Sequence, residues 1–341
     1  YTIPEDYSLE DLVDLGTENY EETANFCATL DRFLQQESPT VREHGLTPAT
    51  YQYYDLKLLR DATSFRLHWL HKILEIEKPE AVLFFATEAE PIRPDLGFLN
   101  ESLYSRLIPL AAAANSIPAH MLRVALPARE IREQPASRSK MLLRWLVGNS
   151  RYATLSTARR MGAFSRWPVR RQPRNTILFN GGGPCLELIL RQIARDGTYR
   201  LVYWQGSGKP INLHPLTGRE IHLRVNRSKL FGCSTECLRL WEKLAHEPWF
   251  RGFFSNVSLD AFPVVESRLR AFVTEMVPEI LRIHLATLQV LQHYRPALFL
   301  TSTVYGHAQR AVMDTARQQQ VPVAGYQHGG WYGYTDFPMH H

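Results

Sequence analysis

Acidic residues are absent from one long interval of this chain: no Asp or Glu occurs between Gln134 and Leu186. Long apolar runs are missing too, and none approaches the ~20 residues that a membrane-spanning helix needs. The 341 residues include only four cysteines, which is too few for a disulfide framework and excludes the class of small disulfide-stabilised domains. Cys233 and Cys237 are four residues apart, but two ligands do not make a zinc site. We therefore expect free thiols, a cytoplasmic protein and no catalytic metal ion.

The acid-free interval is strongly basic. Apolar residues such as Leu142 and Trp145 alternate with its charges, and this pattern suits anionic lipid headgroups or phosphorylated substrates. A solvated helical face beside a linker is the alternative. Nucleic acid is not expected as a partner, because no nucleic-acid module accompanies the charge. We expect part of Arg138–Arg174 to be an exposed helical surface that contacts an acceptor or the inner face of an anionic membrane. Its basic residues are Arg138, Lys140, Arg144, Arg151, Arg159, Arg160, Arg166, Arg170, Arg171 and Arg174.

Strand-length apolar runs alternate with helical patterns along most of the chain, which predicts an α/β fold. Residues 1–50 are polar and acidic and are expected to form short helices and loops that wrap a core, whereas 51–335 form the main domain. The expected fold is a doubly wound, largely parallel, Rossmann-like sheet with helices on both faces. Its strands are expected at Ala81–Phe85, Thr176–Phe179, Leu201–Trp204, Ala297–Leu300 and Val321–Ala324.

Ligands bind to such sheets beyond the carboxyl ends of the strands, so residues at those positions are the candidates for chemistry. Gly181, Gly182 and Gly183 follow the strand "NTILFN" and open a helix. Their spacing matches neither the dinucleotide fingerprint nor the P-loop, so a tight turn and a ligand-facing loop both remain open. Thr301-Ser302-Thr303 occupies the equivalent place after a later strand, where the hydroxyls could cap the next helix or bind a sugar or phosphate.

Two further segments follow predicted strands. The long polar loop Ala86–Arg106 offers Glu101 and Tyr104, a hydrogen-bonding group and an aromatic ring that suit a carbohydrate acceptor, although a solvated surface loop is the alternative. The stretch Gln327-His328-Gly329-Gly330 follows the last predicted strand. A histidine there could act as a general base or donate to a phosphate, because its pKa lies near neutrality.

The segment "RPALFLTSTVYGHAQRAVMDTARQQQVPVAGYQHGGWYG" resembles the end of the N-terminal domain of GT-B-fold glycosyltransferases, and in particular bacterial enzymes that assemble surface polysaccharide and capsule. The resemblance implies an acceptor-binding N-terminal half, with residues 336–341 beginning a linker to a donor-binding C-terminal domain. It implies a nucleotide-sugar donor, a glycan or lipid-linked acceptor, and no cofactor. By position, His328 would be the catalytic residue, and Gly181–Gly183 and Thr301–Thr303 would face the cleft between the two domains. Gln327, Gly329 and Gly330 are expected with them as substrate- or donor-binding residues.

Two other functions remain open at this stage. A sugar-nucleotide epimerase can share the two-domain fold, but such enzymes carry acidic residues near this strand end, where the chain has Gln327-His328-Gly329-Gly330. A non-catalytic module that binds a carbohydrate or nucleotide is the third hypothesis. The sequence indicates neither the sugar nor the nucleotide.

Overall fold

The computed structural model describes residues 10–86, 102–123, 175–181, 184–207, 210–212, 223, 227–256, 259–302 and 306–325. The chain divides into two compact units, each made of two stretches of sequence. Unit 1 comprises Tyr1–Ile131 and Arg227–Glu279, and unit 2 comprises Arg132–Asn226 and Ile280–His341. This division does not follow the predicted boundaries of 1–50 and 51–335, and the predicted linker 336–341 lies outside the described residues.

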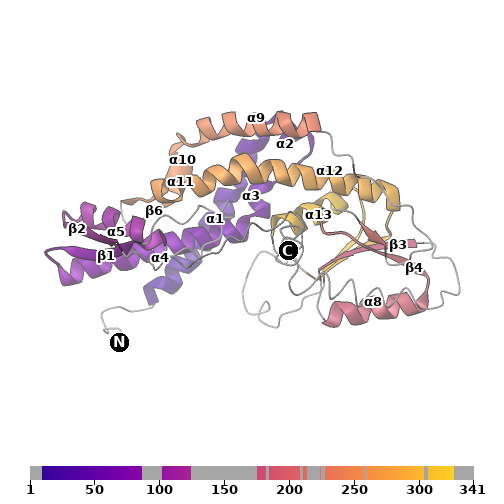
Figure 1. Cartoon of the computed structure of the whole chain (residues 1–341), viewed down its shortest axis with the longest axis horizontal. Helices are drawn as coiled ribbons and strands as arrows, with labels where there is room; N and C mark the ends of the chain where they lie inside the picture. Colours follow the sequence, from indigo (N-terminus) through magenta and orange to yellow (C-terminus); the bar gives the residue numbers. More distant parts are fainter. Residues whose placement is uncertain are drawn as a thin grey trace, which may run out of the picture. The chain divides into compact units, whose positions relative to one another are not determined.

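Unit 1 is mainly helical (Figure 1). Its first helix is a single element of 28 residues rather than the expected short helices and loops. The helices of unit 1 are α1 (Glu10–Glu37), α2 (Pro39–Glu43), α3 (Pro48–Tyr51), α4 (Tyr53–Glu77), α5 (Ser102–Ala114), α9 (Arg227–Leu244), α10 (Pro248–Gly252) and α11 (Phe262–Ala271). Its strands are β1 (Val82–Ala86), β2 (Ala119–Arg123), β6 (Ser255–Asn256) and β7 (Leu259–Asp260).

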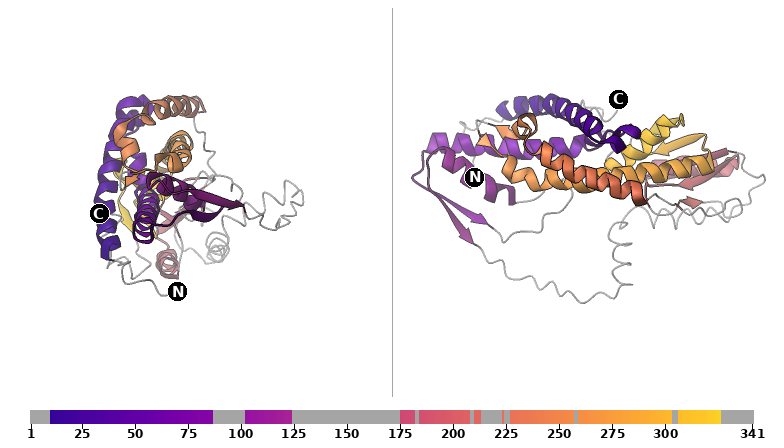
Figure 2. Two further views of the ribbon diagram at one scale, coloured as in Figure 1. Left: turned by 90° about the vertical axis from the view of Figure 1, so that its left-hand side faces the viewer. Right: turned by 90° about the horizontal axis from the view of Figure 1, so that it is seen from above.

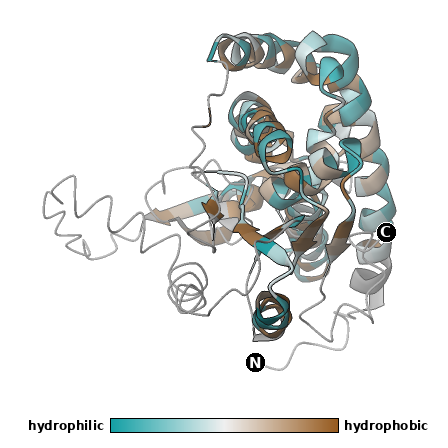
Figure 3. Cartoon of the chain, turned by 90° about the vertical axis from the view of Figure 1, so that its right-hand side faces the viewer, coloured by the Kyte–Doolittle hydropathy of each residue, from teal (hydrophilic) through white to brown (hydrophobic). Residues whose placement is uncertain are grey.

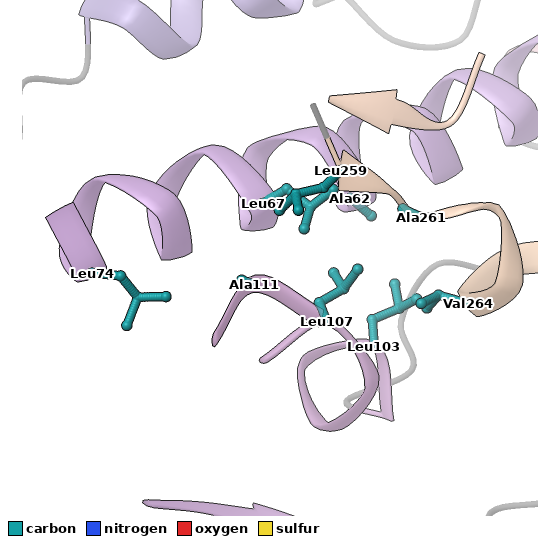
Figure 4. Packing of buried hydrophobic residues seen from close by; sticks show 9 residues of the cluster. All are labelled: Ala62, Leu67, Leu74, Leu103, Leu107, Ala111, Leu259, Ala261 and Val264. Atoms are coloured by element: carbon teal, nitrogen blue, oxygen red, sulfur yellow. The ribbon is translucent and has the colours of Figure 1, made fainter. Parts of the chain in front are cut away.

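One apolar cluster joins α4 and α5 to the segment that follows β7 (Figure 4). Leu67 and Leu74 of α4 pack with Leu103 and Leu107 of α5 in this cluster, and their spacing is typical of one face of a helix. The members of the cluster are Ala62, Leu67, Leu74, Leu103, Leu107, Ala111, Leu259, Ala261 and Val264.

A buried cation ties α1 to α4 and β6. Arg60 donates to Oδ1 of Asn19 at 3.1 Å, to Oε2 of Glu22 at 2.8 Å and to the carbonyl of Ser255 at 3.1 Å. Since Arg60 is only 6% exposed, these bonds and the ion pair replace the water that its guanidinium loses on burial. Phe253 adds a cation–π contact at 5.2 Å.

The prediction of one sheet is wrong for β1. This strand pairs in parallel with β2 alone, in register Val82↔Ala119, and makes a separate two-stranded sheet in unit 1 (Figure 2). Phe84 is buried, while Leu83 and Phe85 on the other face are 66% and 70% exposed. A continuous apolar run predicted a strand correctly, but such a run does not specify its partner strand, and here α5 connects β1 directly to β2.

Unit 2 contains a five-stranded sheet of order β5-β4-β3-β8-β9. The pairs β3–β4, β3–β8 and β8–β9 are parallel, and the short β5 is antiparallel to β4. The other four predicted strands therefore do belong to one largely parallel sheet. The elements of unit 2 are β3 (Asn175–Asn180), α8 (Pro184–Asp196), β4 (Tyr199–Tyr203), β5 (Ile211–Asn212), β8 (Leu298–Thr301), α13 (His307–Gln318), β9 (Val323–Gly325) and most of α12 (Val277–Tyr294).

Helices lie on both faces of this sheet (Figure 1). Ile177 and Phe179 of β3 pack with Leu186 and Leu190 of α8. On the opposite face, Nε1 of the buried Trp204 donates to Oγ1 of Thr287 on α12 at 3.1 Å. Because side chains alternate along a strand, Leu178 and Asn180 face the α12 side. The strands are drawn mostly in brown in Figure 3, the colour of hydrophobic residues.

Pro278 lies in the first turn of α12. In the structure a π-helical turn, Phe272–Met276, lies between α11 and α12, and the N–H of Val277 bonds the carbonyl of Phe272. Proline has no N–H and crowds the carbonyl one turn earlier, and a wider turn relieves that crowding. The mixed α/β architecture with parallel strands is confirmed, while the Rossmann-like, doubly wound GT-B fold stays a prediction.

Candidate ligand-binding edge

The strand order reverses direction between β3 and β8. From β3 the chain crosses through α8 to β4 on one side, and from β8 it crosses through α13 to β9 on the other. Connections that leave neighbouring parallel strands in opposite directions open a crevice at the carboxyl ends of those strands. In this register Asn180 pairs with Thr301, and Thr301 pairs with Gly325. We call the residues at these three strand ends the carboxyl edge: Asn180, Gly181, Thr301, Ser302 and Gly325.

Gly181 and Ser302 lie against each other at this edge. The backbone of Gly181 has φ +84°, a conformation that side chains strongly disfavour. A Cβ added to Gly181 would overlap Oγ of Ser302 and lie 3.2 Å from its Cβ and from its backbone nitrogen. The N–H of Ser302 also bonds the carbonyl of Asn180 at 3.4 Å. The glycine is therefore required by the packing of the two strand ends.

Asn180 and Thr301 form a buried polar pair one residue inside the edge. Asn180 is 1% exposed and Thr301 is fully buried. The hydroxyl of Thr301 donates to Oδ1 of Asn180. Among the described residues, Nδ2 of Asn180 has no hydrogen-bond partner. The pair therefore has one buried donor group that no described residue accepts.

Unit 2 contains two other polar pairs, Trp204–Thr287 and His284–Thr315, in which both contacting atoms have hydrogen-bond partners. Oγ1 of Thr287 donates to the carbonyl of Ile283 at 2.7 Å and so accepts the bond from Trp204. Oγ1 of Thr315 likewise donates to the carbonyl of Ala311 at 2.5 Å, so Nδ1 of His284, at 2.9 Å, is the donor to it.

The structure brings three of the predicted site residues together: Gly181, Thr301 and Ser302. Tyr104 belongs to α5 of unit 1, a different compact unit, and only its backbone is described. The remaining predicted residues lie outside the described residues, as does the basic interval Arg138–Arg174. These remaining residues are Glu101, Gly182, Gly183, Thr303, Gln327, His328, Gly329 and Gly330.

Sequence analysis missed Asn180. The available signal was its position as the last residue of the strand "NTILFN", where a polar side chain ends an otherwise apolar run directly before the glycines. The sequence does not specify which strand pairs with β3 or in which register, so it could not show that Asn180 is opposite Thr301 of β8.

Cys27, Cys233 and Cys237 are buried and form no disulfide bond. Sγ of Cys233 and Sγ of Cys237 are 3.9 Å apart, and this contact and burial raise the pKa of Cys237, which keeps its thiol protonated. Within the described ranges no group of three or more His, Cys, Asp or Glu side chains could hold a metal ion. The helices that the structure describes include none that is long and apolar enough to cross a membrane.

No family model, curated protein or solved structure matches this chain.

Proposed function

We propose that this chain is a glycosyltransferase, or the acceptor-binding half of one, that moves a sugar from a nucleotide-sugar donor to a glycan or lipid-linked acceptor of the cell envelope. In this proposal unit 2 is the Rossmann-like domain of a GT-B architecture. No cofactor takes part in the proposed reaction. Charge on the leaving nucleotide would be stabilised by helix N-termini and arginines.

The proposal rests on one observation: three neighbouring parallel strands end side by side at the same edge of the sheet. Asn180, Thr301 and Gly325 are paired across β3, β8 and β9, so the chain leaves all three strands at one edge. Neighbouring strands are about 4.8 Å apart, which separates the ends of β3 and β9 by about 10 Å. A nucleotide sugar is long enough to contact both ends. Gln327 and His328 come two and three residues after Gly325 in the sequence.

His328 is the proposed catalytic residue. As a general base it would remove the proton from the acceptor hydroxyl as the bond to the sugar forms, and the nucleotide would leave with the electron pair of the broken bond. Gly181–Gly183, Thr301–Thr303, Gln327, Gly329 and Gly330 are proposed to contact the donor, and Glu101 and Tyr104 the acceptor. Arg138–Arg174 is proposed to contact an anionic membrane at its cytoplasmic face.

Thermal unfolding of the full chain with a panel of nucleotide sugars tests the proposal. UDP-glucose, UDP-N-acetylglucosamine, GDP-mannose and CMP-N-acetylneuraminate are suitable probes. A probe present at 100 times its Kd would stabilise the protein by about 2.7 kcal/mol and raise the unfolding temperature by several degrees. The free sugars, without nucleotide, are the control and should cause no shift. If neither a nucleotide sugar nor an acceptor glycan shifts the transition, the proposal fails, because even the acceptor-binding half would bind the acceptor.

A second measurement separates a transferase from a non-catalytic module. A probe that binds should release its nucleotide when an acceptor glycan is added. Binding without nucleotide release, across a range of acceptors, would favour a module that only binds the ligand.

A further inference from the structure

The unused donor of Asn180 is the feature of the carboxyl edge that most directly points to a ligand. Buried amide groups in proteins almost always have hydrogen-bond partners, because an unpaired donor loses its bonds to water without a replacement. The pairs Trp204–Thr287 and His284–Thr315 of the same unit follow this rule. Asn180 is 1% exposed, and within the part of the chain that the structure describes its Nδ2 departs from this rule.

Thr301 contacts the oxygen end of the Asn180 amide. Its hydroxyl donates to Oδ1, so the carbonyl end of the amide is occupied and the NH₂ end is left. Thr301 is fully buried and is the residue paired with Asn180 across β3 and β8. The sheet register therefore holds the two side chains in contact, with the NH₂ group on the far side of the amide from Thr301.

We propose that Nδ2 of Asn180 donates a hydrogen bond to an uncharged oxygen of the bound ligand, and that Thr301 is its positioning residue. The inference rests on the proposed function, since it assigns a ligand contact within the same edge. The oxygen belongs to a sugar hydroxyl or a base carbonyl. A phosphoryl oxygen fits less well: none of Asn180, Gly181, Thr301 and Ser302 carries a charge, and a buried anion needs a charged partner.

Such a contact would select among ligands. A site with a buried donor rejects an analogue that lacks the matching acceptor, because the donor is then left unpaired. We expect the matching oxygen to raise affinity by about 10- to 100-fold over a ligand in which a hydrogen replaces it.

The test is titration calorimetry of the full chain with whichever nucleotide sugar binds the wild type. The double variant Asn180→Leu with Thr301→Val removes both polar groups at nearly constant volume, which leaves no unpaired donor behind. It should fold as the wild type does and bind the probe about 10- to 100-fold more weakly. Thr176→Val is the matched control, since Thr176 lies on the same strand and the same face but at the amino end of β3, and it should bind the probe normally.

Single variants test the positioning role and guard against a double variant that does not fold. Asn180→Asp keeps an acceptor for Thr301 but replaces the NH₂ donor with an oxygen, and it should bind weakly. Thr301→Ser retains the hydroxyl and should bind nearly as well as the wild type, whereas Thr301→Val should not. A merely structural Thr301 would affect unfolding but would leave affinity equal in the folded fraction of each variant.

Smaller probes identify the oxygen. Weaker binding of the free nucleoside by Asn180→Asp assigns the contact to the base or ribose, and an effect confined to the complete nucleotide sugar assigns it to the sugar. If Asn180→Asp weakened the binding of inorganic pyrophosphate to the same extent, the proposal that the ligand oxygen is uncharged would be wrong. Wild-type affinity in the folded Asn180 variants would overturn the inference and leave the proposed function standing, whereas a wild type that binds no probe would remove both.

Discussion

Replacing Gly181 with alanine tests how tightly the ends of β3 and β8 are packed. The substitution acts in two ways. It places a Cβ on a backbone with φ +84°, and it drives that Cβ into Oγ of Ser302. Both effects destabilise unit 2 and neither needs a ligand, so the experiment examines the architecture of the edge separately from its function.

The two contributions have different sizes. A side chain in the left-handed region costs roughly 1–2 kcal/mol. Overpacking a tight contact costs roughly 1–3 kcal/mol. Gly181→Ala should therefore lower the free energy of unfolding by about 2–5 kcal/mol. Ser302→Ala removes Oγ and leaves the Cβ contact at 3.2 Å, so in that background the cost of Gly181→Ala should fall to about 1–2 kcal/mol, the backbone contribution alone.

Native-state hydrogen exchange of peptides from β3 and β8 measures these differences within unit 2. The four proteins of the cycle are the wild type, both single variants and the double variant. A coupling free energy near 1–3 kcal/mol between positions 181 and 302 is expected. Additive effects of the two substitutions would contradict the packing argument, because they would mean that Ser302 does not restrict position 181.

Three further predictions concern single groups. Burial raises the pKa of Asp31 to about 6 from 3.8, against hydrogen bonds from Thr50 and Ala49 that lower it. The protonated carboxyl is thus favoured in the folded state, so its contribution to stability is present below pH 3.8 and is lost as the pH rises through 6. In urea denaturation the free energy of unfolding of the wild type relative to Asp31→Asn should rise by about 2.5 kcal/mol between pH 7 and pH 4. A constant difference would refute this. Thr287→Val should cost about 1–3 kcal/mol, because Nε1 of the buried Trp204 loses its acceptor, while Thr287→Ser should cost much less. His328→Ala should lower turnover by ~10²–10⁴-fold without changing the unfolding transition, and a folded variant with full activity would exclude His328 from the mechanism.

The sequence predicted the elements of unit 2 well because their signals are local. The run "NTILFN" is β3 and the pattern after the glycines is α8, since strand-length apolar runs and amphipathic spacing are properties of adjacent residues. The choice of partner strand does not depend on adjacent residues. The runs that became β1 and β8 look alike in composition, yet β1 pairs with β2 in one unit and β8 pairs with β3 in the other.

The candidate site shows the same division between local and non-local information. Gly181, Thr301 and Ser302 were predicted because each follows a strand, and strand ends can be read from the sequence. Asn180 was missed because its significance depends on the register between β3 and β8, which places it opposite Thr301. No pattern within "NTILFN" reports that register, and its partner is 121 residues away.

The glycine and the asparagine at the end of β3 also differ in what they say about function. A glycine before a helix often allows a ligand to approach the backbone, but Gly181 has a sufficient structural cause in Ser302, which occupies the space of a side chain. Its presence therefore does not by itself indicate a phosphate. Asn180 has such a cause only for its oxygen: Oδ1 accepts the bond from the buried hydroxyl of Thr301, but among the described residues the NH₂ group has no partner. A polar group that the fold does not need is better evidence for a ligand than a glycine that the fold requires.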